Sequence, residues 1–153
     1  MEPTYKEQEV LVSVKGVSIH EENSQEEISL LTVGRLCFIS EEEIILQYDE
    51  VDLETQKTSH TKILINAKQV TMTKTGDYGS NMLFEKGKNM QSRYRTPFGD
   101  LEMNIYTTKT EIDLLKDRGE IFLQYQLTIQ NSFSAMHEIE IFYIINNEEE
   151  KND

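Results

Sequence analysis

The sequence contains a single cysteine, Cys37, no tryptophan and only two prolines. One cysteine cannot form a disulfide within the chain, and it cannot supply the several thiolates of a metal cluster. The start of the chain lacks a basic segment followed by an apolar run, and the longest apolar stretch, 141–145, is too short to span a bilayer. We therefore expect a cytoplasmic protein that is neither secreted nor inserted into a membrane.

Positive charge is also scarce. The chain of 153 residues carries 15 Lys and Arg against 28 Asp and Glu, which gives a formal net charge of −13 at pH 7. Phosphate backbones and anionic lipid surfaces would be repelled on average, so neither nucleic acid nor a membrane is an expected partner. The length fits one domain whose core is large enough to fold without disulfides or a structural metal.

Apolar and polar residues alternate with period two from Val10 onward, which is typical of strands with one face on a core and one in solvent. The clearest alternation lies in 121–129 and 139–145. The segment 28–39 differs because it is apolar on both parities, so this strand should be covered on both sides. Gly34 in its middle predicts a bend or a bulge.

Short connectors rich in turn residues separate these segments, at 75–80, 85–88, 96–99 and 117–120. Only 110–119 could hold a helix, and that helix would be shorter than three turns. Because no long helix is available for parallel crossovers, the strands should be mainly antiparallel.

The sequence therefore predicts an all-β fold of about eight or nine strands, either a two-sheet sandwich or a meander closed into a barrel. We favour the barrel because closure leaves no exposed strand edges. We expect residues 1–145 to form a single β-barrel domain and residues 146–153 to form a disordered acidic tail.

Two arginines flank a tyrosine in the stretch 92–108, just before a Pro-Phe-Gly turn. With residues 96–99 as the hairpin tip, the facing pairs are Arg95 with Asp100, Tyr94 with Leu101, Arg93 with Glu102 and Ser92 with Met103. In this register the arginines lie outside in ion pairs worth roughly 0.2–1 kcal/mol each, and we favour it because it accounts for both faces. A shift by one residue would instead turn both guanidinium groups inward, where they could bind a carboxylate or a phosphate.

Four tyrosines share the predicted inward parity with aliphatic neighbours. Buried phenol hydroxyls need hydrogen-bond partners, which other side chains, backbone groups, water or a bound ligand can supply. Together with the two arginines they form the candidate ligand-binding set of the barrel lumen: Tyr48, Tyr94, Tyr125, Tyr143, Arg93 and Arg95.

Several short motifs occur in an order and spacing that resemble a known family. They are YDEVD at 48–52, VTMTKTG at 70–76, MLFEKG at 82–87, RYRTPFGDLEM at 93–103, the pair Thr107 and Thr108, DRGEIFLQYQL at 117–127 and HEIEIFY at 137–143. From about Glu26 to Tyr143 the chain resembles the bacterial family of domain-of-unknown-function 1934, the YwiB-like proteins. The resemblance implies a small cytoplasmic calycin-type β-barrel, similar in architecture to lipocalins and fatty-acid-binding proteins, with no established activity. The family often has Arg where this chain has Lys74, so a bidentate contact at that position is not expected here.

Motifs of catalysis and metal binding are missing. His20, His60 and His137 lie on different predicted segments without the spacing of a metal site, and no nucleophile elbow, phosphate-binding loop or dinucleotide fingerprint occurs. We predict no metal, no cofactor and no catalytic residues. Cys37 lies among apolar residues and is expected to be an inert buried thiol.

Three classes of function remain open. The leading hypothesis is a non-catalytic binding module for a small, partly apolar or anionic ligand, because a barrel of this size either fills its lumen with side chains or holds one small molecule. The alternative is a structural or protein-interaction scaffold with a filled barrel. An enzyme comes third, with His137, Tyr125 and Arg95 as residues that a barrel could bring together.

Overall fold

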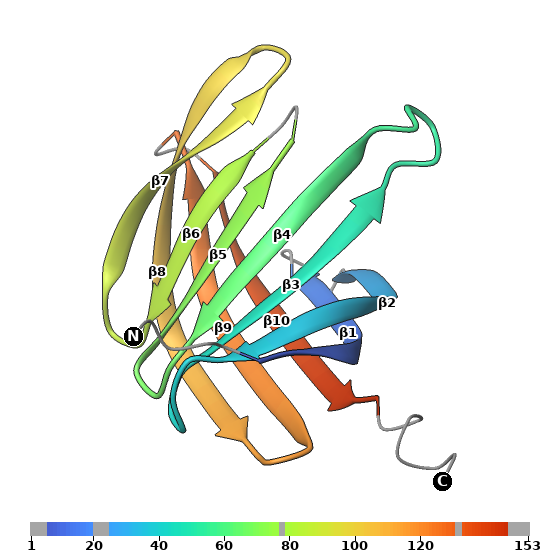
Figure 1. Ribbon diagram of the computed structural model, residues 1–153. Coiled ribbons are helices and arrows are strands. Elements are labelled where there is room, and N and C mark those ends of the chain that lie inside the picture. The colour runs from blue at the N-terminus through green and yellow to red at the C-terminus, as the bar shows by residue number, and fades with distance from the viewer. Residues whose placement is uncertain (1–5, 20–24, 77–78, 131–132, 147–153) are drawn as a thin grey trace, which may run out of the picture.

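A computed structural model describes residues 6–19, 25–76, 79–130 and 133–146, which form ten antiparallel strands and no helix (Figure 1). The strands are β1 (Glu7–Ile19), β2 (Gln25–Phe38), β3 (Ile44–Val51), β4 (Thr58–Ile65), β5 (Gln69–Thr75), β6 (Ser80–Glu85), β7 (Asn89–Thr96), β8 (Gly99–Leu114), β9 (Arg118–Ile129) and β10 (Phe133–Ile145). The expected all-β meander is confirmed, with ten strands in place of about eight or nine. Within the described ranges no helix is long and apolar enough to cross a membrane.

Pairing between the first and last strands closes the sheet into a barrel. Each strand pairs with the next along the chain, and β1 also pairs with β10, from Val10 opposite Ile145 to Ile19 opposite Met136. In Figure 1 the blue and red ends of the described chain accordingly lie on adjacent strands. A closed antiparallel sheet has one inner and one outer face, so alternate residues of every strand share the lumen.

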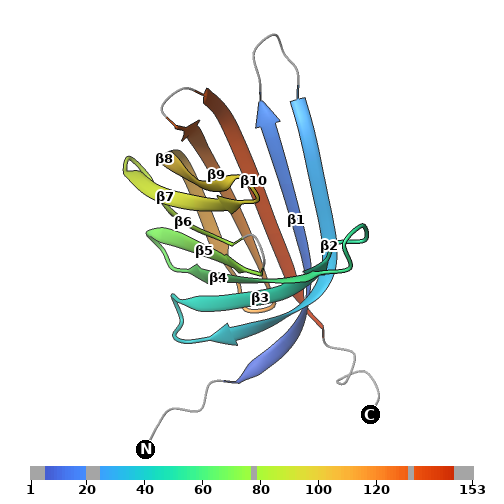
Figure 2. The ribbon, with the colours of Figure 1, turned by 90° about the horizontal axis from the view of Figure 1, so that it is seen from above.

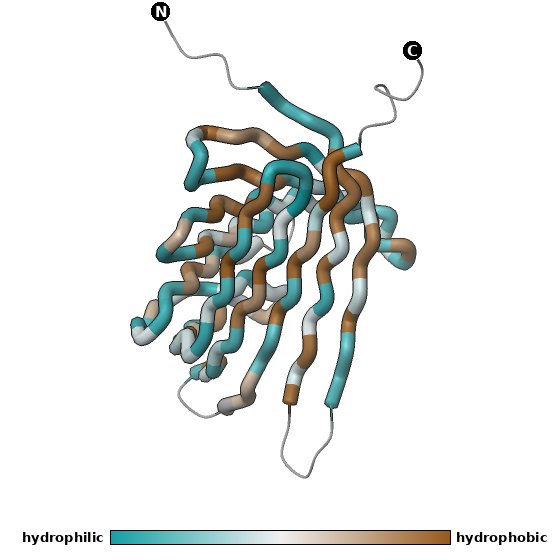
Figure 3. The backbone as a smooth tube through the Cα atoms, turned by 90° about the horizontal axis from the view of Figure 1, so that it is seen from below, coloured by the Kyte–Doolittle hydropathy of each residue, from teal (hydrophilic) through white to brown (hydrophobic). Residues whose placement is uncertain are grey.

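The core consists of the inward residues at one end of the barrel. Brown and teal segments alternate along the strands in Figure 3, as the period-two pattern predicts. The largest side chains that are fully buried are Tyr143, Phe84, Leu36, Ile44, Leu46, Ile63, Ile65, Ile105, Ile121, Leu123, Ile141 and Val10.

The prediction of a possible helix at 110–119 is wrong, since β8 continues to Leu114 and the turn lies at 115–117. Thr110, Ile112 and Leu114 face Leu123, Ile121 and Gly119 of β9. Every second side chain of this segment therefore points into the barrel, an arrangement that a helix would destroy.

Gly119 was expected in a turn and Gly34 at a bend or a bulge, and the turn and the bulge are not observed. Gly119 is not in a turn but is buried in β9, where an added Cβ would overlap the Tyr143 ring. Gly34 is not a bulge, because the pairing of β1 with β2 continues across it without interruption; an added Cβ there would come within 2.6 Å of the Gln47 carbonyl oxygen. The register shift that does occur lies in β8, between Thr107 and Lys109.

The strands β2 and β3 diverge after a short paired region. Residues 35–38 pair with residues 44–47, whereas in the described chain residues 25–34 pair only with β1 (Figure 2). The outer side of this segment is not covered as expected, since Leu31 and Val33 are 69% and 58% exposed. The core thus explains the apolar residues on the inner side of this segment but not those on its outer side.

The contact between β6 and β7 is the weakest along the sheet. One registered pair, Ser80 opposite Tyr94, joins these strands. The backbone N–H of Arg95 also donates to the Gly79 carbonyl oxygen, and the Ser92 hydroxyl donates to the Asn81 carbonyl oxygen. Strand β7 has eight registered pairs with β8, so β7 is held by β8 much more firmly than by β6.

Some expectations lie outside the described residues. These are the acidic tail from residue 147 onward, His20, and the middle of the connector 75–80. The extent of a single domain over residues 1–145 stays a prediction, although strands from Glu7 to Ile145 all belong to the one barrel.

We predict that Gly119→Ala lowers the free energy of unfolding by roughly 1–3 kcal/mol, because the new methyl group overlaps the buried Tyr143 ring. Gly16→Ala in β1 is the matched control, since a Cβ there meets no atom within 4 Å and should change stability by less than about 0.5 kcal/mol. Urea unfolding measures both. Equal effects of the two substitutions would contradict this packing role.

Candidate functional site

The inward face of the barrel is most deeply buried towards one end and more exposed towards the other. We call the more exposed end the open half, meaning the inward residues near that end that keep contact with solvent. They are Val14, Gly16 and Ser18 of β1, Leu30 and Thr32 of β2, Ser59 of β4, Met72 and Lys74 of β5, Ser80 and Met82 of β6, Leu101 of β8, Leu127 and Ile129 of β9, and His137 of β10. Solvent reaches these side chains, so a small molecule of suitable shape can reach them too.

A row of mostly polar inward residues crosses six neighbouring strands, from the buried interior at β3 to the open half. Strand register places these inward residues side by side in the order Tyr48, Thr61, Lys74, Ser80, Tyr94 and Leu101. Thr61 is buried and hydrogen-bonds to the Tyr48 hydroxyl, whereas Tyr94 is 40% exposed. The row therefore runs from a satisfied buried end to an accessible aromatic ring.

Lys74 is the cation of this row. Its Nζ lies 3.9 Å from Oε2 of Glu50, and both side chains are partly exposed. A cavity of about 390 Å³ lies beside them, lined by Glu50, Val51, Asp52, Thr55, Lys57, Thr58, Ser59, Lys74 and Tyr94. An ammonium group and a phenol at the wall of one cavity can hold an anionic group together with an apolar surface.

Methionines lie on the core side of the polar row. Met72 of β5 faces Met82 of β6, and both pack against the buried core. Unbranched thioether side chains adapt to irregular shapes, so this part of the inward face can accommodate different apolar groups.

A histidine lies on the opposite wall. Nδ1 of His137 is 3.1 Å from Oγ of Ser18, and the imidazole ring stacks on Tyr125 with 5.3 Å between centroids. Tyr125 in turn contacts Phe84 at 4.9 Å. The fold thus brings His137 and Tyr125 together, as the enzyme hypothesis required, but Arg95 lies on β7 with its side chain in solvent.

The arginine hairpin has the register that we favoured. Arg93 lies opposite Glu102 and Arg95 opposite Asp100, with 3.9 Å between Nε of Arg95 and Oδ1 of Asp100. The shifted register, which would turn both arginines inward, is not the one observed, and Arg95 is 70% exposed in its side chain.

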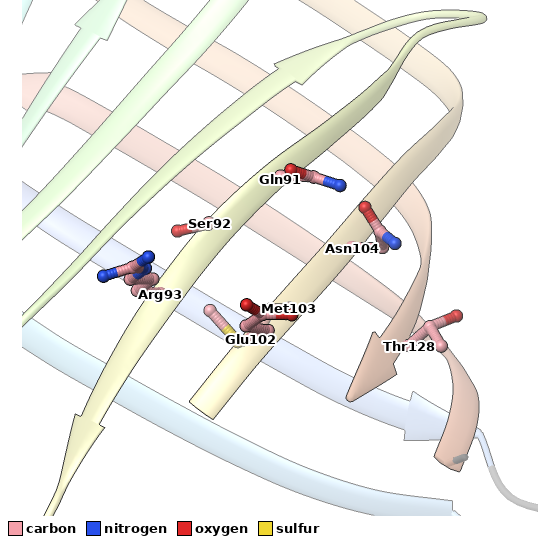
Figure 4. Close-up of a pocket in the computed structure, with 7 residues that line it drawn as sticks. All are labelled: Gln91, Ser92, Arg93, Glu102, Met103, Asn104 and Thr128. Carbon is pink, nitrogen blue, oxygen red and sulfur yellow. The ribbon is translucent and has the colours of Figure 1, made fainter. Parts of the chain in front are cut away.

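A groove of about 320 Å³ lies on this hairpin (Figure 4). Its lining comprises Gln91, Ser92 and Arg93 of β7, Glu102, Met103 and Asn104 of β8, and Thr128 of β9. One basic and one acidic side chain lie at facing positions there, so the groove offers no net charge to an ion.

The four predicted tyrosines all lie on the inward face but do not form one cluster. Tyr48, Tyr125 and Tyr143 are buried, and only Tyr94 is accessible. Tyr143 packs over Gly119 near the closed end, and its hydroxyl has no hydrogen-bond partner among the described residues. A ligand role for the tyrosines and for the two arginines stays a prediction.

Burial controls the ionisation of three of these phenols. Loss of solvation raises the pKa of Tyr125 and of Tyr143 to about 12. For Tyr48 burial and the nearby Glu50 carboxylate raise the pKa to about 12, although the hydrogen bond with Thr61 opposes this shift. All three side chains are therefore neutral hydroxyls at physiological pH.

The other candidate groups do not form a site. Within the described ranges no cluster of three His, Cys, Asp or Glu side chains could hold a metal ion. His60 is paired on the outer face, with 2.6 Å from Nδ1 to Oδ1 of Asp49 and 2.9 Å from Nε2 to Oε1 of Gln47. Cys37 is half-buried and not fully buried as expected.

Sequence reasoning did not select Lys74 as a site residue. The available signal was parity, because Lys74 shares its parity in β5 with the inward residues Val70 and Met72. A charged residue on the apolar parity of a strand indicates either a rim position or a binding role. The contact of Ser18 with His137 left no such signal, since 119 positions separate the two residues.

Comparisons with known proteins agree on the fold. A family model described as "Domain of unknown function (DUF1934)" matches residues 12–141. The uncharacterized beta-barrel protein YwiB of Bacillus subtilis (strain 168) is 26% identical over 139 residues, which cover 90% of this chain and 94% of that protein. The crystal structure of the ywiB protein from Bacillus subtilis has a TM-score of 0.78 at 23% identity, covering 94% of this chain and 96% of that one.

The raised tyrosine pKa values predict a loss of stability in alkali. The unfolded chain loses the Tyr125 proton near pH 10 and the folded chain only near pH 12, so the stabilising effect is complete below pH 10 and lost as pH rises towards 12. The loss from this residue should be on the order of 3 kcal/mol. Urea unfolding of the wild type and Tyr125→Phe between pH 8 and 12 measures it. The variant should show the smaller decline, and identical declines would refute the assignment.

Proposed function

Since the chain belongs to the DUF1934 family, we propose that it is a non-catalytic β-barrel binding module that holds one small, partly apolar, anionic ligand in its open half. The observation that carries this proposal is the cavity whose lining includes Lys74 and Tyr94. Its volume of about 390 Å³ is in the range of small-molecule sites, and its mostly polar lining includes Val51 and Tyr94.

Lys57 and Lys74 are the basic residues of the cavity lining and Glu50 and Asp52 the acidic ones, so an anionic group on the ligand depends on a direct contact with Lys74 and not on a net charge of the site. Lys74 is the cation on the inward polar row, in a chain whose formal net charge is −13. Glu50 partly neutralises it at 3.9 Å, so a ligand carboxylate or phosphate has to compete with this carboxylate. Both partners are partly exposed, so Glu50 can turn into solvent at small cost when Lys74 binds another anion.

The apolar part of the ligand would contact Tyr94 in the cavity lining and would meet the methionines only beyond that lining. Tyr94 is accessible, and Met72 and Met82 lie between the polar row and the core. A filled barrel acting only as a scaffold accounts for the closed end, where the side chains are fully buried. It does not account for inward residues of the open half that remain in contact with solvent.

We predict that an anionic apolar probe raises the thermal midpoint of the wild type and binds Lys74→Met at least about tenfold more weakly, because a charge-assisted hydrogen bond is lost. Lys62→Met is the matched control, since Lys62 lies on β4 with its side chain exposed on the other face. Calorimetric titration with a medium-chain fatty acid and with an aryl phosphate compares carboxylate and phosphate ligands.

Native mass spectrometry of the protein purified gently from its own host supplies a second readout, in which a retained small molecule is expected. The proposal fails if neither probe shifts the thermal midpoint and the native protein shows only the mass of the bare chain. Equal loss of affinity in the Lys74 and Lys62 variants would place the ligand elsewhere.

A further inference from the structure

The outer surface of three adjacent strands carries a group of large apolar side chains. We call it the outer patch, and it consists of Leu31 and Val33 of β2, Leu11 of β1, and Phe142 and Ile144 of β10. Leu31 and Val33 are 69% and 58% exposed, and Leu11 is 42% exposed. Phe142 and Ile144 are 36% and 40% exposed. The site in the open half does not use them, because they belong to the opposite face of the sheet.

Strand register arranges the outer patch in two rows. Val33, Leu11 and Ile144 lie side by side in the first row. In the second row the small Ser13 lies between Leu31 and Phe142. The patch thus contains no ionisable side chain, in a chain with 43 Lys, Arg, Asp and Glu residues, and its centre has a recess at Ser13 next to a projection at Leu11.

The exposed area is large enough for a specific interface. The five side chains together expose on the order of 400 Å², a size that usually marks a functional surface on a soluble protein. Two such patches in contact would bury about 800 Å² of apolar side chain. With the usual polar rim, the total exceeds the approximately 1,000 Å² of the smallest stable interfaces.

We propose that the outer patch is the interface between two copies of this chain, packed face to face about a two-fold axis that runs across the strands. This axis reverses each strand, so the first row of one copy lies on the second row of the other. Val33 then lies on Leu31 of the second copy and Ile144 on Phe142 of the second copy. Leu11 enters the recess at Ser13 of the second copy, so projection and recess are complementary.

The rim charges fit the same arrangement. With Leu11 over Ser13 of the second copy, the next outward residues of β1 place Glu9 opposite Lys15 of the second copy, twice by symmetry. Within one chain Glu9 and Lys15 are six residues apart on a strand, about 20 Å, and do not pair. Lys15 contacts Glu27 at 3.6 Å in an exposed pair that costs little to exchange.

The salt dependence of binding distinguishes a second copy of this chain from a basic partner. Two chains of charge −13 repel each other at long range, and the contact itself is apolar, so added salt should strengthen dimerisation. A basic partner attracted to the acidic chain would bind more weakly in high salt.

Sedimentation velocity over a range of protein concentrations, at about 50 mM and 500 mM salt, tests the proposal. The wild type should dimerise, with a lower dissociation constant at high salt. Leu31→Lys should raise that constant at least about tenfold. Leu53→Lys is the matched control and should leave it unchanged, because Leu53 is 89% exposed between β3 and β4 and outside the patch.

A charge exchange tests the register. Glu9→Lys and Lys15→Glu should each weaken the dimer, and the double variant should restore it, because the exchanged charges meet again across the interface. A monomer at every concentration and salt would overturn the proposal, as would a dimer that Leu31→Lys leaves intact or one that weakens as salt increases. Far-ultraviolet circular dichroism confirms that each variant is folded.

Discussion

The pairing of β1 with β10 is the interaction on which the other features depend. It joins the first strand to the last and converts a ten-stranded meander into a closed sheet with one interior. Closure satisfies the backbone groups that two terminal strands would otherwise expose, and it directs every second side chain of each strand to the same enclosed space. The division of each strand into a core parity and a solvent parity follows from this one constraint.

The interior then serves two purposes along its length. At the closed end aliphatic and aromatic side chains are fully buried and supply the stability of the fold. Towards the other end the inward positions combine serine, threonine, lysine and histidine with methionine, valine, leucine and isoleucine, and these residues keep contact with solvent. These residues contribute less to the core, and the binding role proposed above depends on their inward position.

Period two in the sequence was sufficient to predict the all-β meander, the inward parity of the tyrosines and the facing of Arg93 and Arg95 with acidic residues. It was not sufficient for Gly119, because a glycine in a turn and a glycine under an aromatic ring look alike until Tyr143 is placed. Nor could it show that the outer side of residues 28–33 is exposed, since parity describes which residues share a face but not what covers that face. The contact of Ser18 with His137 depends on barrel closure and therefore required the complete fold.

The contact between β6 and β7, with its one registered pair, determines where the sheet opens locally. Local opening of a sheet occurs where the fewest backbone hydrogen bonds must break, so β7 and the tip of β8 separate from β6 at a lower free energy than any motion that divides β8, β9, β10 and β1. Tyr94 lies at this contact and Lys74 faces Ser80 beside it. The weakly paired contact between β6 and β7 therefore lies next to Lys74 and Tyr94, which line the cavity described above.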